Sequence, residues 1–258
     1  MPLIKNTIPI ILAAGKGKRM GTIKNKCLLS IEGKTLLEWT ILSLQKAGFK
    51  EMVVVSRSTD NDIESLIKRK KLTDVIVAKD PFFLGAGHAL FVGTSALKSL
   101  NKYDQVLVLY GDDSFLYRPE TLNNFAESFS KKQSRLQIMI SSRKIVGTIG
   151  GLKRDQQGKP VGFYTQPELV ELKKEIVEIV CGAFLFNLDW LNNHYYKITK
   201  SVANGEFILT SLIQIAHSEG TPAEVFELSK SDEWNGVNTV EDLRKARILK
   251  RGQLNSYQ

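Results

Sequence analysis

Short apolar runs alternate with stretches of helical spacing through the first 110 residues, and this alternation constrains the fold more than any other feature. The strand-length apolar runs are residues 8–12, 52–55, 74–78 and 105–110. The stretches of helical spacing between them are residues 35–47, 61–69 and 87–100. Because strands that alternate with helices form βαβ units, the sequence predicts an α/β, Rossmann-like fold of three layers with a mixed, mostly parallel sheet.

The pattern changes in the second half of the chain, where strands dominate. The expected strands are residues 136–141, a hairpin of 152–154 and 162–164, and 178–186. We expect helices on either side of residues 223–228 and a last helix at 240–249. Asn61 and Glu64 have the spacing of a capping box. Without a linker or repeat, the sequence predicts one domain over residues 1–258, with halves at 1–130 and 131–258.

Composition limits the classes of protein to which the chain can belong. Hydrophobic residues make up 43% and charged residues 24%, as in ordinary globular proteins. The longest apolar run, residues 8–14, is too short to span a bilayer. Two cysteines suggest no disulfide framework, so we expect a cytoplasmic protein without a membrane partner. The net charge of +9 favours anionic partners. The basic runs lack a nucleic-acid motif, so we expect nucleoside triphosphates and sugar phosphates instead.

A glycine-rich, basic loop at residues 12–21 follows the first apolar run. Small residues let the backbone approach a ligand, and exposed N–H groups after a strand bind anions. Arg19 can grip phosphate oxygens in pairs, and Lys26 could reach the α-phosphate or an acceptor phosphate. Neither the dinucleotide fingerprint nor the P-loop fits the spacing of this segment. The loop therefore favours a triphosphate site, the alternative being a turn with solvated lysines.

Polar residues follow the run at 105–110. Asp112 comes directly after Tyr110 and Gly111, at the carboxyl end of a strand, where ligands bind in open α/β sheets. Mg²⁺ prefers oxygen ligands and shares its shell with substrate phosphates. Asn238, within residues 236–239, offers a second ligand oxygen. The alternatives are a β-turn at Asp112 and a helix N-cap at Thr239, the latter being compatible with a ligand role for Asn238.

In order along the chain, these motifs resemble those of the sugar-nucleotide pyrophosphorylases, most closely the uridylyltransferase domain of the bifunctional N-acetylglucosamine-1-phosphate uridylyltransferases. The matching segments are residues 12–20, 84–89, 106–112, 150–159, 205–210 and 236–238. The resemblance implies a fold of the GT-A type. It also implies Mg²⁺-dependent transfer of a nucleoside monophosphate from a triphosphate, with UTP favoured, to a sugar 1-phosphate.

The resemblance implies a role for each matching residue. The implied nucleotide-binding residues are Leu12, Ala13, Ala14, Gly15, Gly17, Lys26, Gly85, Ala86, Tyr110 and Gly111. The implied catalytic residues are Arg19, Lys26 and Asp112. The implied sugar-binding residues are Gly150, Thr165, Val180, Glu206 and Thr210. Asp112 and Asn238 would bind the metal.

Several departures from the family pattern fall on residues that read the base and the sugar. The base-reading Gln is missing, and a neighbouring Thr is Ala86. A sugar-contacting Glu falls at Thr165 and a sugar-side Asn at Val180. We therefore expect a sugar 1-phosphate other than N-acetylglucosamine 1-phosphate, and either weak discrimination between UTP and dTTP or a preference for another base. About twenty residues follow Asn238, too few for the left-handed β-helix of the bifunctional enzymes.

Three alternatives remain open on the sequence. A molybdopterin-type nucleotidyltransferase fits residues 19–21 and 238–243. In a GT-A glycosyltransferase, Asp112 and Asp113 would hold the metal, although a sugar-nucleotide donor has no triphosphate for the basic loop to grip. The third is a catalytically silent sensor of nucleotide sugars. For any of these we expect a monomer or a weak homo-oligomer.

Overall fold

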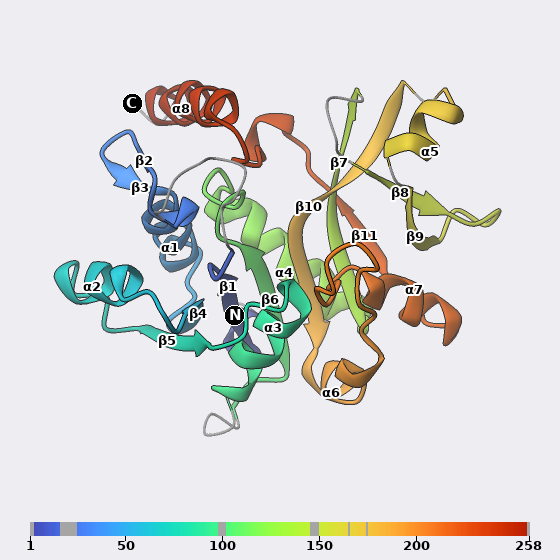
Figure 1. Cartoon of the computed structure of the whole chain (residues 1–258), viewed down its shortest axis with the longest axis horizontal. Helices are drawn as coiled ribbons and strands as arrows, with labels where there is room; N and C mark the ends of the chain where they lie inside the picture. Colours follow the sequence, from blue (N-terminus) through green and yellow to red (C-terminus); the bar gives the residue numbers. More distant parts are fainter. Residues whose placement is uncertain are drawn as a thin grey trace.

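The computed structural model describes residues 3–15, 25–97, 102–144, 150–164, 166–173 and 175–256. Its centre is a seven-stranded sheet in the order β11-β7-β10-β6-β1-β4-β5 (Figure 1). The strands are β1 (Thr7–Leu12), β4 (Met52–Arg57), β5 (Val75–Asp80), β6 (Gln105–Tyr110), β7 (Leu136–Lys144), β10 (Ile176–Asn187) and β11 (Glu224–Glu227). Only β10 runs antiparallel to its neighbours, so the predicted mixed, mostly parallel sheet is confirmed.

Helices cover both faces of the sheet because its central strands are apolar on both sides. The helices on one face are α1 (Leu36–Lys46), α2 (Asp62–Arg69) and α4 (Pro119–Lys132). The helices on the other face are α3 (Ala86–Ser95), α6 (Leu188–Asn192) and α7 (Ser211–Ser218). Alternate residues of β1 divide between the two cores, Ile11 in the first and Ile10 in the second. The three predicted layers are therefore present.

Smaller elements surround this centre. A two-stranded sheet of β2 (Ser30–Ile31) and β3 (Lys34–Thr35) contacts α8 (Val240–Asn255), as Figure 1 shows. The expected hairpin is present as β8 (Gly151–Arg154) and β9 (Pro160–Tyr164), and α5 (Gln166–Glu171) follows it. No helix in the described ranges is long and apolar enough to cross a membrane.

Some local expectations were wrong. The capping box at Asn61 does not form, because Asn61 makes no side-chain cap, and the Asp60 carboxylate accepts the hydrogen bond from Asp62 N at 2.8 Å. Helix α3 ends at Ser95 rather than at residue 100, and α8 continues six residues beyond 249. Helix α4 was not anticipated. Thr239 is the N-cap of α8, within a capping box that Asp242 completes.

Candidate active site

A cavity opens at the carboxyl ends of β1, β5 and β6, where the parallel strands of an open sheet commonly bind ligands. It is lined by Leu12, Ala14, Gly15, Asp80, Phe83, Gly85, Ala86, Ala89, Tyr110, Asp112 and Glu206. The structure thus brings the described start of the predicted phosphate loop, residues 12–15, to the same place as the segment at residues 84–89 and the end of β6. Glu206, which the sequence predicts to bind the sugar, also lines this cavity.

Backbone contacts fix Glu206 against the start of α3. Phe207 N donates to Leu84 O at 2.6 Å, and Gly87 N donates to Phe207 O at 3.0 Å. Gly85 has φ +96°, and a Cβ there would lie 2.7 Å from Glu206 Cβ and 2.9 Å from Phe207 O. Only glycine allows this approach, so the glycine predicted from the sequence joins the two walls of the cavity.

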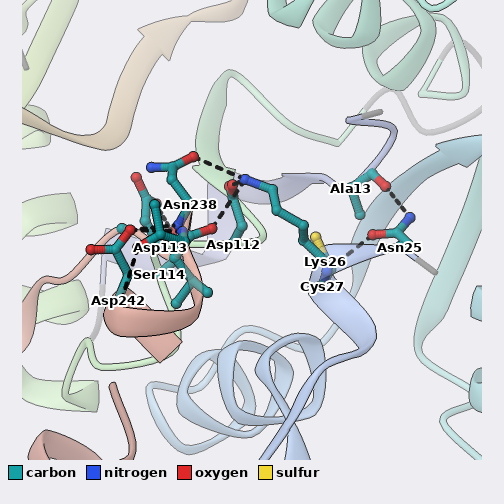
Figure 2. A network of polar contacts seen from close by, with 12 residues as sticks. Ala13, Asn25, Lys26, Cys27, Asp112, Asp113, Ser114, Asn238 and Asp242 are labelled. Carbon is teal, nitrogen blue, oxygen red and sulfur yellow. Dashed lines mark hydrogen bonds and ion pairs between the residues drawn. The ribbon is translucent and has the colours of Figure 1, made fainter. Parts of the chain in front are cut away.

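Lys26 lies at the centre of a polar network that includes Asp112, a residue of the cavity lining (Figure 2). Its ammonium forms an ion pair with the Asp112 carboxylate and donates to Asn238 Oδ1 at 3.0 Å and to Val237 O at 3.1 Å. Val237 N in turn donates to Asp112 O at 3.1 Å. The three predicted residues, far apart in sequence, therefore meet at one point.

The short helix that carries Lys26 is held in place by the buried side chain of Asn25. Asn25 caps this turn, η3 (Lys26–Leu28), by accepting from Cys27 N at 3.0 Å. The Asn25 amide also donates to Ala13 O at 2.6 Å. Because Asn25 is buried, these two bonds hold Lys26 at a fixed position relative to the end of β1.

The oxygens around the Lys26 ammonium are donors of the kind that a divalent metal takes. A carboxylate oxygen of Asp112 and the amide oxygen of Asn238 converge on a single cationic nitrogen. Mg²⁺ uses such oxygens and completes its shell with water and phosphate. Among the described residues no group of three or more His, Cys, Asp or Glu side chains could hold a metal. Two converging oxygens fit a cation that completes its shell with water and substrate phosphate.

Asp113 differs sharply from its neighbour Asp112. Its side chain is 7% exposed and lies against Gly182, where a Cβ would be 2.4 Å from Asp113 Oδ2. Gly182 has φ +64° and belongs to an irregularity in the pairing of β10 with β7. Burial, and next the charge of Asp112, raises the pKa of Asp113 well above its ordinary value. Asp112 thus faces the cavity, whereas Asp113 is packed in the interior.

Other predicted residues in the described ranges do not line the cavity. Ala13 and Gly111 are buried, and Gly111 N donates to Leu12 O at 3.0 Å. Within the described ranges, the cavity lining does not include Gly150, Val180 or Thr210. Thr210 is the N-cap of α7, and Val180 packs against the core.

Three further predicted residues, Gly17, Arg19 and Thr165, lie outside the described residues.

The structure adds two lining residues that lie outside the sequence motifs, Asp80 and Phe83. Asp80 is the last residue of β5. A polar residue that ends a buried parallel strand is the same signal that identified Asp112. Asp80 has the same feature, but it does not belong to any of the motifs found in the sequence.

Comparison with known proteins adds sequence and fold relationships. The profile of the MobA-like NTP transferase domain matches residues 9–172. The bifunctional protein GlmU of Buchnera aphidicola subsp. Acyrthosiphon pisum is 30% identical over 254 residues, which cover 98% of this chain and 53% of the relative. GlmU of Staphylococcus carnosus is 27% identical over 248 residues, 96% of this chain and 53% of the relative. The chain thus spans about half the length of these relatives.

A similar fold occurs in the crystal structure of a Bacillus anthracis protein assigned as a glucose-1-phosphate thymidylyltransferase. The TM-score is 0.74 with 19% identity, and the match covers 95% of each chain. Taken with the seven-stranded sheet, this similarity confirms the predicted Rossmann-like α/β fold.

Proposed function

The chain belongs to the family of MobA-like NTP transferase domains and is a nucleotidyltransferase, and on that premise we propose that it transfers a nucleoside monophosphate from a triphosphate to a sugar 1-phosphate. The observation that carries the proposal is the convergence of Lys26, Asp112 and Asn238 beside the cavity that the loop at residues 12–15 lines. Positive charge and metal-type oxygens at one point suit phosphoryl chemistry, which depends on positioning and charge neutralisation.

In the proposed reaction a phosphate oxygen of the acceptor forms a bond to the α-phosphorus. The bond from that phosphorus to the bridging oxygen of the β-phosphate breaks, and pyrophosphate leaves. Lys26 would neutralise the α-phosphate or the acceptor phosphate, and Arg19 the departing pyrophosphate. Enzymes of this family generally use a divalent metal ion. We propose Mg²⁺, which Asp112 and Asn238 would hold and which would neutralise phosphate charge.

We further propose that residues 1–130 bind the nucleotide and residues 131–258 the acceptor. Glu206, on the cavity wall, supports a sugar site next to the α-phosphate. Gly150, Thr165, Val180 and Thr210 would form its more distant part. Since Val180 has no hydrogen-bonding side chain, we expect a sugar other than N-acetylglucosamine. The two unpaired cysteines, both buried, agree with a cytoplasmic enzyme.

The test is release of pyrophosphate from the full chain with Mg²⁺, crossing ATP, GTP, CTP, UTP and dTTP with a panel of sugar 1-phosphates. UTP, which the resemblance favours, is the reference donor. We expect turnover with at least one pair and its loss in Asp112→Ala. A molybdopterin-type acceptor is the second candidate, since the matching profile is of the MobA type. Turnover with that acceptor and with no sugar 1-phosphate would contradict the proposal.

A further inference from the structure

The wall of the cavity contains a buried carboxylate with one oxygen that is not used by the protein. Asp80 is fully buried. Its Oδ1 accepts from Phe82 N at 2.9 Å and from Phe83 N at 3.1 Å, and His88 Nδ1 lies 3.1 Å from the same oxygen. Its Oδ2, also buried, has no hydrogen-bond partner among the described residues. Buried polar atoms nearly always form a hydrogen bond, so we expect a bound ligand to supply the donor for Oδ2.

The position of Asp80 indicates which part of a ligand would supply that donor. Asp80 lines the cavity together with Gly85 and Ala86, the segment proposed to contact the base. The proposed phosphate and metal residues, Gly15 and Asp112, come from the ends of β1 and β6. In the sheet order, β5 is separated from β6 by β1 and β4. Asp80 therefore belongs to the side of the cavity away from the metal, where the base of a nucleotide would lie.

We propose that Asp80 Oδ2 accepts a hydrogen bond from an exocyclic amino group, so that the enzyme selects a triphosphate whose base carries such a group over one with uracil or thymine. This inference rests on the proposed function, and it reverses the preference for UTP that the sequence resemblance favours. Since Oδ1 is already occupied, one oxygen is left, which suits a single N–H contact.

The selection follows from the chemistry of a carboxylate, which accepts hydrogen bonds but cannot donate. Cytosine presents an amino group where uracil presents a carbonyl oxygen, so uracil would place two acceptors against each other. The uracil N3–H lies between two carbonyl oxygens. A group that pairs well with this edge must therefore accept from N3–H and also donate to a carbonyl oxygen, which a carboxylate cannot do. A buried acceptor left unpaired by the wrong base discriminates strongly.

The sharpest variant is Asp80→Asn. It can keep Oδ1 for the N–H groups of Phe82 and Phe83 while placing an amide donor where Oδ2 lies. The atom at the position of Oδ2 then changes from acceptor to donor at nearly constant volume. Asp74→Asn is the matched control. Asp74 is an exposed carboxylate directly before Val75, the first residue of β5, whereas Asp80 is the last.

Two measurements on the full chain test the inference. The first is kcat/KM for pyrophosphate release with a sugar 1-phosphate that supports turnover. The second is the Kd of each nucleotide without acceptor, by calorimetry. The informative pairs are CTP with UTP, ATP with ITP and GTP with ITP, since the second member of each lacks an amino group of the first. We expect a preference of about tenfold or more for the amino-bearing member of one pair, which identifies the base.

We expect Asp80→Asn to reduce that preference by about tenfold or more, while Asp74→Asn leaves it unchanged. If the preferred base is cytosine or adenine, Asp80→Asn should also improve use of the oxo-bearing member of the pair, UTP or ITP. The inference is overturned if the parent enzyme binds and uses UTP as well as CTP and ITP as well as ATP and GTP. It is also overturned if a folded Asp80→Asn variant keeps the parent's preference. The parent comparison decides even if that variant does not fold. Absence of turnover with every acceptor would instead reject the proposed function, and the Kd values would still test Asp80.

Discussion

Lys26 and Asp112, 86 residues apart in the sequence, form an ion pair in which the two side chains are 13% and 26% exposed. Because the same ammonium contacts Asn238 Oδ1, it stands where the two proposed metal ligands converge. A divalent cation and the ammonium cannot share this position. If the proposed metal binds there, Lys26 would have to move away from these oxygens, and we propose that its charge then contacts a phosphate of the substrate.

The first prediction concerns the competition between the Lys26 ammonium and a metal ion for one position. Lys26→Met should strengthen binding of Mn²⁺ without nucleotide by about tenfold, because a competing positive charge is removed. The same variant should lose turnover by two or more orders of magnitude, because a phosphate contact is lost. Calorimetry with Mn²⁺ and pyrophosphate release measure the two effects. Lys131→Met, on the surface of α4, is the control. Weaker metal binding in Lys26→Met would show that Lys26 supports the metal rather than excludes it.

The second prediction concerns the ligands themselves. Asp112→Ala should abolish metal-dependent turnover, and Asn238→Ala should reduce it less, because a neutral carbonyl oxygen is a weaker ligand than a carboxylate. Thermal unfolding should show both variants folded, since the Asp112 side chain contributes little to the core. Activity near that of the parent for Asp112→Ala at limiting Mg²⁺ would remove the metal assignment.

The third prediction contrasts two glycines of the cavity. Gly85→Ala should lower the free energy of unfolding by about 1–3 kcal/mol and weaken nucleotide binding, because its φ is positive and the new Cβ meets Glu206 and backbone. At Gly15, a Cβ would have nothing within 4 Å. Gly15→Ala should therefore keep its stability and lose only nucleotide affinity. Denaturant unfolding and nucleotide titration separate the two. Equal loss of stability in both would contradict the geometry.

The fourth prediction uses Lys250, which is 6% exposed on α8. Its ammonium donates to Phe115 O at 3.0 Å and lies 4.3 Å from the centre of the Trp39 ring. Burial, with smaller effects from the charges of Lys46 and Arg118, lowers the pKa of Lys250 from 10.5 to about 8. Between these two pH values the unfolded chain holds a proton that the folded chain has released.

Stability should therefore rise with pH from about 8 to 10.5 through this residue, and the gain should be absent below pH 8. In Lys250→Met the gain disappears, so the difference in unfolding free energy between parent and variant should change by about 3 kcal/mol at most across that window. Urea unfolding at pH 7, 8, 9 and 10 measures it. A difference that does not vary with pH would contradict the lowered pKa.

The fold was largely predictable because the residues of both cores recur in the sequence with the spacing of strands and helices. Helix α4 was missed even though Leu122, Phe125, Ala126 and Phe129 have helical spacing and are all buried. The ends of α3 and α8 were misplaced because helical periodicity identifies a helix better than it locates where the helix stops.

The site was predictable wherever a motif carried the residue. The sequence led to Lys26, Asp112 and Asn238, and the structure brings them together. Their proposed roles stay predictions. Asp80 could not be found in this way, because its interest lies in one unpaired oxygen, which depends on burial and on the two N–H groups that occupy the other oxygen.

The meeting of Lys26, Asp112 and Asn238 also has a consequence for biosynthesis. Their ion pair and hydrogen bond span 86 and 212 residues of sequence, and such distant contacts form late and slowly during folding. A growing chain would display the phosphate loop long before residue 238 leaves the ribosome. A chain that stalls before residue 238 would therefore contain the ends of β1 and β6 but lack Asn238, one of the two proposed metal ligands.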